Sequence, residues 1–133
     1  MTREWEEAAH RGTMDVLQRL LDAGADIDAR DGHGQTALMI AAVEGRRQTV
    51  EWLVAHGAAL DRTAKYGLSA LMLAVVNGHA DIVRALTDAG ARLDLRGTGA
   101  PGFADRTALD LALGRNDEAI VGILRSRAAH RRP

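Results

Sequence analysis

The sequence predicts an all-α protein in which about four helix-turn-helix repeats stack into a solenoid and are linked by β-hairpin-like turns. Three observations support this prediction. Glycines recur at one fixed interval, hydroxyl residues precede short apolar stretches, and only 3% of the residues are aromatic. A fixed period of about 20–50 residues indicates a repeat architecture, in which each unit packs only on its neighbours. A core of small aliphatic side chains suits closely stacked helices.

Two sets of glycines keep the same interval: Gly12, Gly45 and Gly78 (45 − 12 = 78 − 45 = 33), and Gly24, Gly57 and Gly90 (57 − 24 = 90 − 57 = 33). The register then shifts, because Thr107 follows Ser69 at an interval of 107 − 69 = 38, which exceeds the period by 38 − 33 = 5. We therefore expect one domain over residues 1–133, with repeats at about 1–30, 31–63, 64–96 and 97–130, the five-residue insertion within 97–105, and a basic tail at 128–133.

Each unit contains the start and stop signals of two helices. A hydroxyl residue precedes each short apolar stretch, at Thr36, Ser69 and Thr107. Such a side chain can accept a hydrogen bond from the first turn of a helix. The stretches end at residues that tolerate a left-handed backbone: Gly45, Gly78 and Asn116. A second helix follows with apolar residues at helical spacing, as at Val50, Leu53 and Val54.

The motif sequence carries a resemblance. From Asp31 to Ala42 the chain reads Asp-Gly-His-Gly-Gln-Thr-Ala-Leu-Met-Ile-Ala-Ala, with Gly45 following. This stretch resembles the opening of the ankyrin repeat, Asp-x-x-Gly-x-Thr-Pro-Leu-His-x-Ala-Ala-x-x-Gly. The stretch Gly-Ala-Asp-Ile-Asp-Ala at 24–29 resembles its close, Gly-Ala-Asp-Val-Asn-Ala. The resemblance covers about residues 4–129 and implies an ankyrin-repeat solenoid.

The chain departs from the family pattern in several places. Alanine replaces the proline, and Met39, Met72 and Asp110 replace the histidine. In the family this histidine forms hydrogen bonds between neighbouring repeats, so we expect apolar contacts in their place. Trp5 should cover the core of the first unit, and Trp52 should pack between repeats or against the outer side of the array. The atypical first and last units favour a complete small array over a fragment.

Composition argues against several classes of function. The 17 basic and 18 acidic residues give a net charge of −1, which does not favour nucleic-acid binding. No cysteine is present, and no apolar run resembles a signal peptide or a membrane span. We expect a cytoplasmic monomer. Lysine occurs once among the basic residues, at Lys65, which favours a bacterial source of high GC content.

Motifs for catalysis or cofactor binding are weak. The histidines at 10, 33, 56 and 79 recur at an interval of 33 − 10 = 23, out of phase with the repeat, so they should not converge on a metal ion. The glycine-rich stretch 97–102 lacks the lysine of a phosphate-binding loop and is expected to be an extended loop. No hydroxyl lies beside a candidate base. We expect no enzyme activity and no cofactor.

The resemblance implies binding of a protein partner through a concave face formed by the hairpin tips and the first helices. On this basis the expected partner-binding residues are Arg11, Arg30, His33, Gln35, Val43, Glu44, Lys65, Tyr66, Leu68, Val76, Asn77, Arg96 and Arg115. We expect Tyr66, Leu68 and Val76 at the centre, because tyrosine is enriched at energetically dominant contacts. The alternative is that Tyr66 is only a tolerated exposed ring.

The basic rim of this face predicts an acidic partner surface. Phe103 and Arg106 of the insertion are further candidates for contact, and the basic tail is either a solvated helix end or a second contact. The chain would then act as an inhibitor, an immunity protein or an adaptor. The alternative function is structural, through self-association of a last repeat whose Ile120 and Ile123 are thinly covered.

Overall fold

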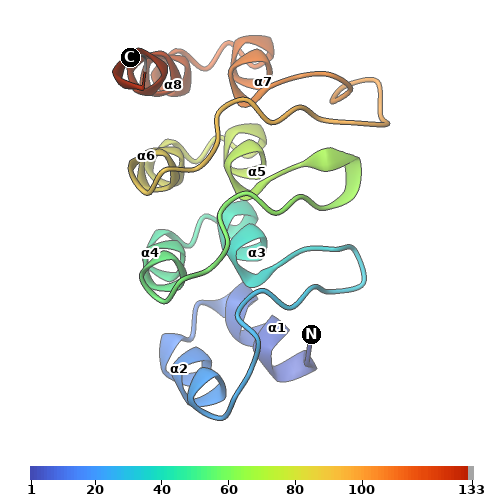
Figure 1. Cartoon of the computed structure of the whole chain (residues 1–133), viewed down its shortest axis with the longest axis vertical. Helices are drawn as coiled ribbons and strands as arrows, with labels where there is room; N and C mark the ends of the chain where they lie inside the picture. Colours follow the sequence, from blue (N-terminus) through green and yellow to red (C-terminus); the bar gives the residue numbers. More distant parts are fainter. Residues whose placement is uncertain (132–133) are drawn as a thin grey trace.

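The chain folds into four helix pairs stacked in one column, seen in a computed structural model that describes residues 1–131 (Figure 1). The pairs are α1 (Arg3–Arg11) with α2 (Met14–Asp22), α3 (Ala37–Glu44) with α4 (Arg47–Ala55), α5 (Ala70–Val76) with α6 (Ala80–Asp88), and α7 (Ala108–Gly114) with α8 (Glu118–His130). The all-α fold of about four repeats is confirmed.

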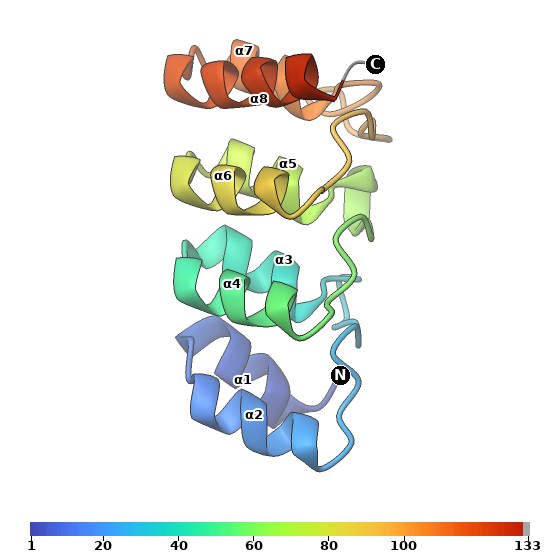
Figure 2. The ribbon, with the colours of Figure 1, turned by 60° about the vertical axis from the view of Figure 1, so that its left-hand side comes forward.

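The helices form two layers. The first helices of the units, α1, α3, α5 and α7, contact one another in sequence, and α4, α6 and α8 form the second layer (Figure 2). Three loops between units project from the first-helix layer to the same side (Figure 1). The third loop, between α6 and α7, holds the five-residue insertion. No helix within residues 1–131 is long and apolar enough to cross a membrane.

The expected helix caps are present. The side chains of Thr36, Ser69 and Thr107 accept hydrogen bonds from backbone N–H groups three residues later, at 3.4, 3.3 and 3.2 Å. Asn116 takes the place of a glycine at the end of the first helix of the last unit, with φ of 56°. Such a left-handed backbone is tolerated by asparagine more readily than by most residues.

Apolar and polar contacts both join neighbouring repeats. Met39 and Met72 are buried, as expected for side chains that replace the family histidine. In addition, a side chain of each following unit donates a hydrogen bond to the last turn of the preceding first helix. The donors and acceptors are Arg46 to the carbonyl of His10 at 3.1 Å, His79 to that of Val43 at 3.1 Å, and Arg115 to that of Val76 at 2.7 Å. These carbonyls recur at the repeat interval (43 − 10 = 76 − 43 = 33), so the bond repeats with the period of the array.

The last unit corrects two expectations. Residues 128–130 belong to α8 and are not a tail, and Arg131 donates hydrogen bonds to the carbonyls of Ala91 at 2.7 Å and Thr87 at 3.0 Å, at the end of α6. Residues 132–133 of the expected tail lie outside the described residues. Ile120 and Ile123 belong to the buried core, so they are not thinly covered.

Candidate functional site

The loops and the ends of the first helices form the surface on which partner binding is expected, called here the concave surface. The first loop is shaped by Asp31, whose carboxylate accepts the N–H groups of His33 and Gln35 at 2.9 and 2.8 Å. Arg30 joins this loop to the next, donating to the carbonyls of Gly34 at 2.9 Å and Thr63 at 2.7 Å. The tips are therefore held in place relative to one another.

The second loop presents Tyr66. Alanine replaces the loop aspartate here, at Ala64, and a 3₁₀ turn over Lys65–Gly67 shapes the tip. Tyr66 lies in the left-handed region with φ of 65°, which is unfavourable for an aromatic residue. The residue is 37% exposed, and the ammonium group of Lys65 lies 5.0 Å from the centroid of its ring. The loop tip therefore exposes an aromatic ring at a residue whose left-handed backbone is unfavourable for an aromatic side chain.

The insertion folds back onto Tyr66. The N–H of Thr98 donates to the carbonyl of Tyr66 at 2.7 Å, and the rings of Tyr66 and Phe103 stack with centroids 5.7 Å apart and planes at 29°. The loop closes on itself at Gly97, where a Cβ atom would lie 2.2 Å from the carbonyl oxygen of Phe103. Only glycine fits at that position, so the sequence permits this fold of the loop.

A hollow of about 300 Å³ lies between this loop and the helices α5 and α7. Its side-chain lining combines an aliphatic floor, one aromatic ring and charged groups: Val76, Phe103, Arg106, Asp110, Leu111 and Arg115. Asp110 accepts the N–H of Thr107 at 3.0 Å, and this hydrogen bond is the largest cause of the lowered pKa of the Asp110 carboxyl. The hollow therefore offers an apolar surface bordered by charges of both signs.

Unpaired positive charge is spread over the concave surface, and two of these basic residues, Arg106 and Arg115, line the hollow. Five basic side chains of the concave surface have no carboxylate partner within residues 1–131: Arg11, Arg30, Lys65, Arg106 and Arg115. Two acidic residues of the same surface are already engaged. Glu44 pairs with His10 at 3.1 Å, and Asp105 lies 3.6 Å from Arg96. Asp31 and Asp110 also lie on this surface without an ion-pair partner within residues 1–131, so the unpaired basic groups still outnumber the unpaired acidic ones although the whole chain carries a net charge of −1.

The prediction that Leu68 lies at the centre of the binding surface is wrong. The residue is only 6% exposed and packs into the core beneath the tip, while the carbonyl of Leu68 accepts the N–H of Ala64 at 2.9 Å. Removing the apolar side chain of leucine from water is favourable, so burial of Leu68 stabilises the fold. Leu68 therefore supports the Tyr66 loop from below and does not present its side chain to a partner.

The remaining expected residues divide by their roles in the fold. His33 and Arg11 are exposed, and Gln35, Val43 and Val76 are half-buried. The amide of Asn77 donates to the carbonyl of Leu73 at 2.8 Å, so it also closes the end of α5. Arg96 donates to the carbonyl of Asp105 at 2.8 Å and braces the insertion. Phe103 and Arg106 are expected only as further candidates and Leu111 is not expected at all; the three meet at the hollow because the insertion folds back.

Within residues 1–131 no group of three or more histidine, aspartate or glutamate side chains is placed to hold a metal ion. Trp52 is half-buried against the core and stacks on His56 with ring centroids 4.0 Å apart, as a structural residue would. The fold thus defines a helical repeat protein whose loops and first helices form one continuous surface.

The match to a family model assigns the repeat type. The model described as ankyrin repeats (3 copies) matches residues 5–97, which is more than half of the chain, and the protein belongs to the ankyrin-repeat family. The human protein named ankyrin repeat domain-containing protein 29 is 51% identical over 39 residues, which are 29% of this chain and 13% of the human protein. Ankyrin repeats generally mediate protein–protein interaction and are usually without catalytic activity.

Proposed function

We propose that the chain binds one protein partner through the concave surface, with the stacked rings of Tyr66 and Phe103 at the centre of the contact. The observation that carries this proposal is the stacked pair beside a hollow, in which the ring of Tyr66 is exposed and that of Phe103 is half-buried, since aromatic anchors dominate the energetics of interfaces. Val76 and Leu111 supply the apolar floor of that hollow. A side chain of the partner would fill it and stack against Phe103.

We further propose that the contacting surface of the partner is acidic. The supporting observation is the excess of unpaired arginine and lysine over the concave surface, with Arg106 and Arg115 at the edge of the hollow. Opposite charge across an interface mainly raises the association rate and selects the partner. Such binding would serve an inhibitor, an immunity protein or an adaptor. A cytoplasmic setting is supported by the lack of cysteine in the sequence.

The test is affinity capture from a lysate of source cells, followed by quantitative mass spectrometry. Three baits are compared: the wild-type chain, a site variant carrying Tyr66→Asn and Arg106→Glu, and a control variant carrying Arg84→Glu on the exposed side of α6. Asparagine tolerates the left-handed backbone of Tyr66, so the site variant should fold. A partner captured by wild type and control, but not by the site variant, supports the proposal.

Captured partners are then measured directly. Purified partner should bind the wild-type chain more weakly as salt rises, because the attraction between exposed charges is screened. A partner that binds all three baits equally would disprove the proposed site while keeping the binding role. Adding the chain to an assay of the partner's own activity separates inhibition from recruitment.

A further inference from the structure

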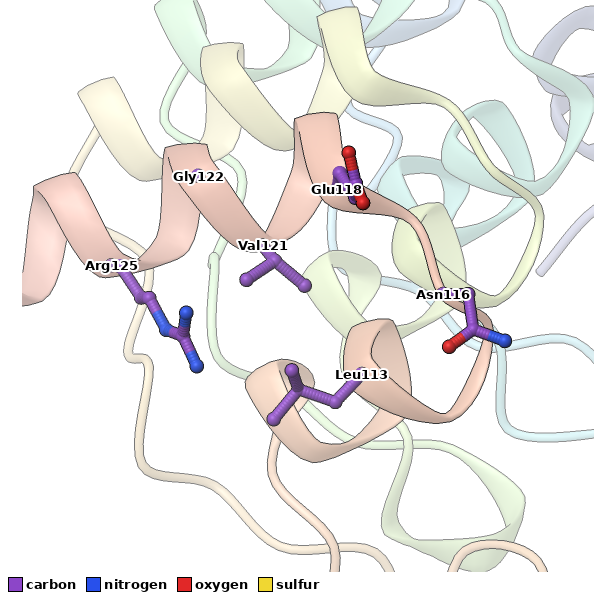
Figure 3. Close-up of a pocket in the computed structure, with 6 residues that line it drawn as sticks. All are labelled: Leu113, Asn116, Glu118, Val121, Gly122 and Arg125. Atoms are coloured by element: carbon purple, nitrogen blue, oxygen red, sulfur yellow. The ribbon is translucent and has the colours of Figure 1, made fainter.

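The last helix pair leaves one face without a neighbouring repeat among residues 1–131. A groove of about 450 Å³ lies on this face between α7 and α8, and we call it the end groove (Figure 3). Its lining residues are Leu113, Asn116, Glu118, Val121, Gly122 and Arg125. In Figure 3 the side chain of Val121 points from α8 toward Leu113, with Arg125 and Glu118 on either side of it along the helix.

The end groove continues the stacking interface of the array. Leu113, Val75 and Ala42 occupy corresponding positions, because 113 − 75 = 38 is the shifted interval of the last unit and 75 − 42 = 33 is the repeat interval. Ala42 and Val75 are 0% exposed, because the next repeat covers them, whereas Leu113 is 44% exposed. Within residues 1–131, the surface that buries apolar side chains between inner repeats is therefore exposed at Leu113.

Charges on α8 make the face complementary to itself. Glu118, Val121, Gly122 and Arg125 are spaced i, i+3, i+4 and i+7, so they share one side of the helix. Neither Glu118 nor Arg125 has an ion-pair partner within residues 1–131. The midpoint between these two charges falls between Val121 and Gly122. A two-fold axis at that point would set two copies of α8 antiparallel, with each Glu118 opposite Arg125 of the other copy.

The residues at the midpoint suit a helix crossing. A Cβ atom at Gly122 would meet no atom within 4 Å, so this position faces open space. Without a side chain there, two helix backbones can approach closely. Leu113, which is 44% exposed, then supplies apolar contact on both sides of the axis, with the mostly buried Val121 beneath it. We propose that a second copy of this chain occupies the end groove, in a two-fold dimer whose α8 helices cross at Val121 and Gly122.

The opposite end of the array argues against head-to-tail stacking. Glu6 and Glu7 occupy the positions that correspond to Met39 and Ile40, at 39 − 33 = 6 and 40 − 33 = 7. Head-to-tail contact would place these carboxylates against the apolar groove and would also produce open filaments. The two-fold arrangement closes on itself and does not use Tyr66, so it is independent of the proposed partner binding.

The test is sedimentation equilibrium of the purified chain from micromolar to millimolar concentration. The wild type should shift from monomer to dimer, and Glu118→Arg and Arg125→Glu should each weaken the dimer at least about tenfold, because like charges then meet at both contacts. Arg62→Glu reverses an exposed arginine on another repeat and should leave the dimer unchanged. Circular dichroism verifies that each variant is folded.

The decisive sample is an equimolar mixture of the Glu118→Arg and Arg125→Glu variants. A mixed antiparallel dimer places an arginine of one copy opposite a glutamate of the other at both contacts, so the mixture should associate more strongly than either variant alone, and a mixture that associates no better would contradict the proposal. The double variant carrying both changes restores opposite charges at both contacts and should dimerise like the wild type. A wild-type chain that stays monomeric throughout, species larger than a dimer, or a double variant that fails to associate would overturn the proposal.

Discussion

Two glycines provide a matched test of how the repeats are held together. Gly45 and Gly57 both have positive φ, at 74° and 89°, so alanine is unfavourable at either position. Their surroundings differ. A Cβ atom at Gly45 would lie 2.9 Å from Cε1 of His79 in the next repeat, whereas one at Gly57 would meet nothing within 4 Å. We therefore expect Gly45→Ala to reduce the free energy of unfolding more than Gly57→Ala.

The size of the difference follows from the contact at His79. Left-handed backbone costs an alanine about 1–2 kcal/mol, and this term applies to both glycines. At Gly45 the methyl group must also displace the ring whose Nε2–H donates to the carbonyl of Val43 at 3.1 Å. Loss of such a hydrogen bond costs about 1 kcal/mol. Gly45→Ala should thus cost about 1 kcal/mol more than Gly57→Ala.

The assay is urea unfolding of the two single variants, of His79→Ala, and of the double variant Gly45→Ala with His79→Ala. Without the ring the collision disappears, so the alanine at Gly45 should then cost no more than the alanine at Gly57. Unchanged m-values would show that the array still unfolds as one unit. Equal costs for the two glycines, or an excess cost of Gly45→Ala that persists in the His79→Ala background, would refute the reasoning.

Three further predictions concern the caps and the ends of the array. The hydrogen bond from the Thr107 backbone N–H is the chief cause of the lowered pKa of the Asp110 carboxyl in the folded chain. The charged carboxylate therefore stabilises the fold at a pH above its unfolded pKa of about 3.9. This stabilisation is lost as the pH falls through the lower folded pKa. The urea midpoints of wild type and Asp110→Asn should therefore differ at pH 7 and converge as the pH falls below about 4; a gap that stays constant would contradict this. Arg131→Ala removes two hydrogen bonds to the end of α6 and should lower stability by about 1 kcal/mol in thermal melts, whereas an unchanged midpoint would mean that these bonds contribute nothing. The indole N–H of Trp5 is buried without a hydrogen-bond partner within residues 1–131, so Trp5→Phe should change stability by less than about 1 kcal/mol and Trp5→Ala should cost about 3–5 kcal/mol. A loss with phenylalanine as large as that with alanine would contradict this.

The repeat period predicted most of the fold. Hydroxyl caps and turn glycines act locally, so Thr36, Ser69 and Gly45 could be assigned to helix ends from the sequence, and the structure confirms each assignment. The bonds between repeats could not be predicted in the same way. Arg46 and Arg115 reach corresponding carbonyls from non-corresponding positions, and only the geometry of stacking shows that their bonds are equivalent.

The sequence placed Tyr66 at an exposed loop tip, as the structure shows, but did not predict that Leu68 is buried. Leu68 corresponds to the half-buried Gln35, at 68 − 33 = 35, so its position lies partly under the loop. A polar residue there can reach water, but a leucine is drawn into the core. Phe103 could be placed in the insertion but not against Tyr66, because that contact depends on the close approach at Gly97 and on the path of the whole loop.

Some basic side chains of the concave surface hydrogen-bond to backbone carbonyls of the fold and others do not, so their substitution should affect stability and partner binding differently. Arg115 is held by the carbonyl of Val76, and Arg30 is held by two carbonyls, so both guanidinium groups are ordered before a partner arrives. Binding to ordered groups costs less conformational entropy. The side chain of Arg106 forms no hydrogen bond within residues 1–131. Arg115→Gln should therefore weaken both the fold and partner binding, whereas Arg106→Gln should weaken binding alone, and unfolding curves measured beside affinities would separate the two effects.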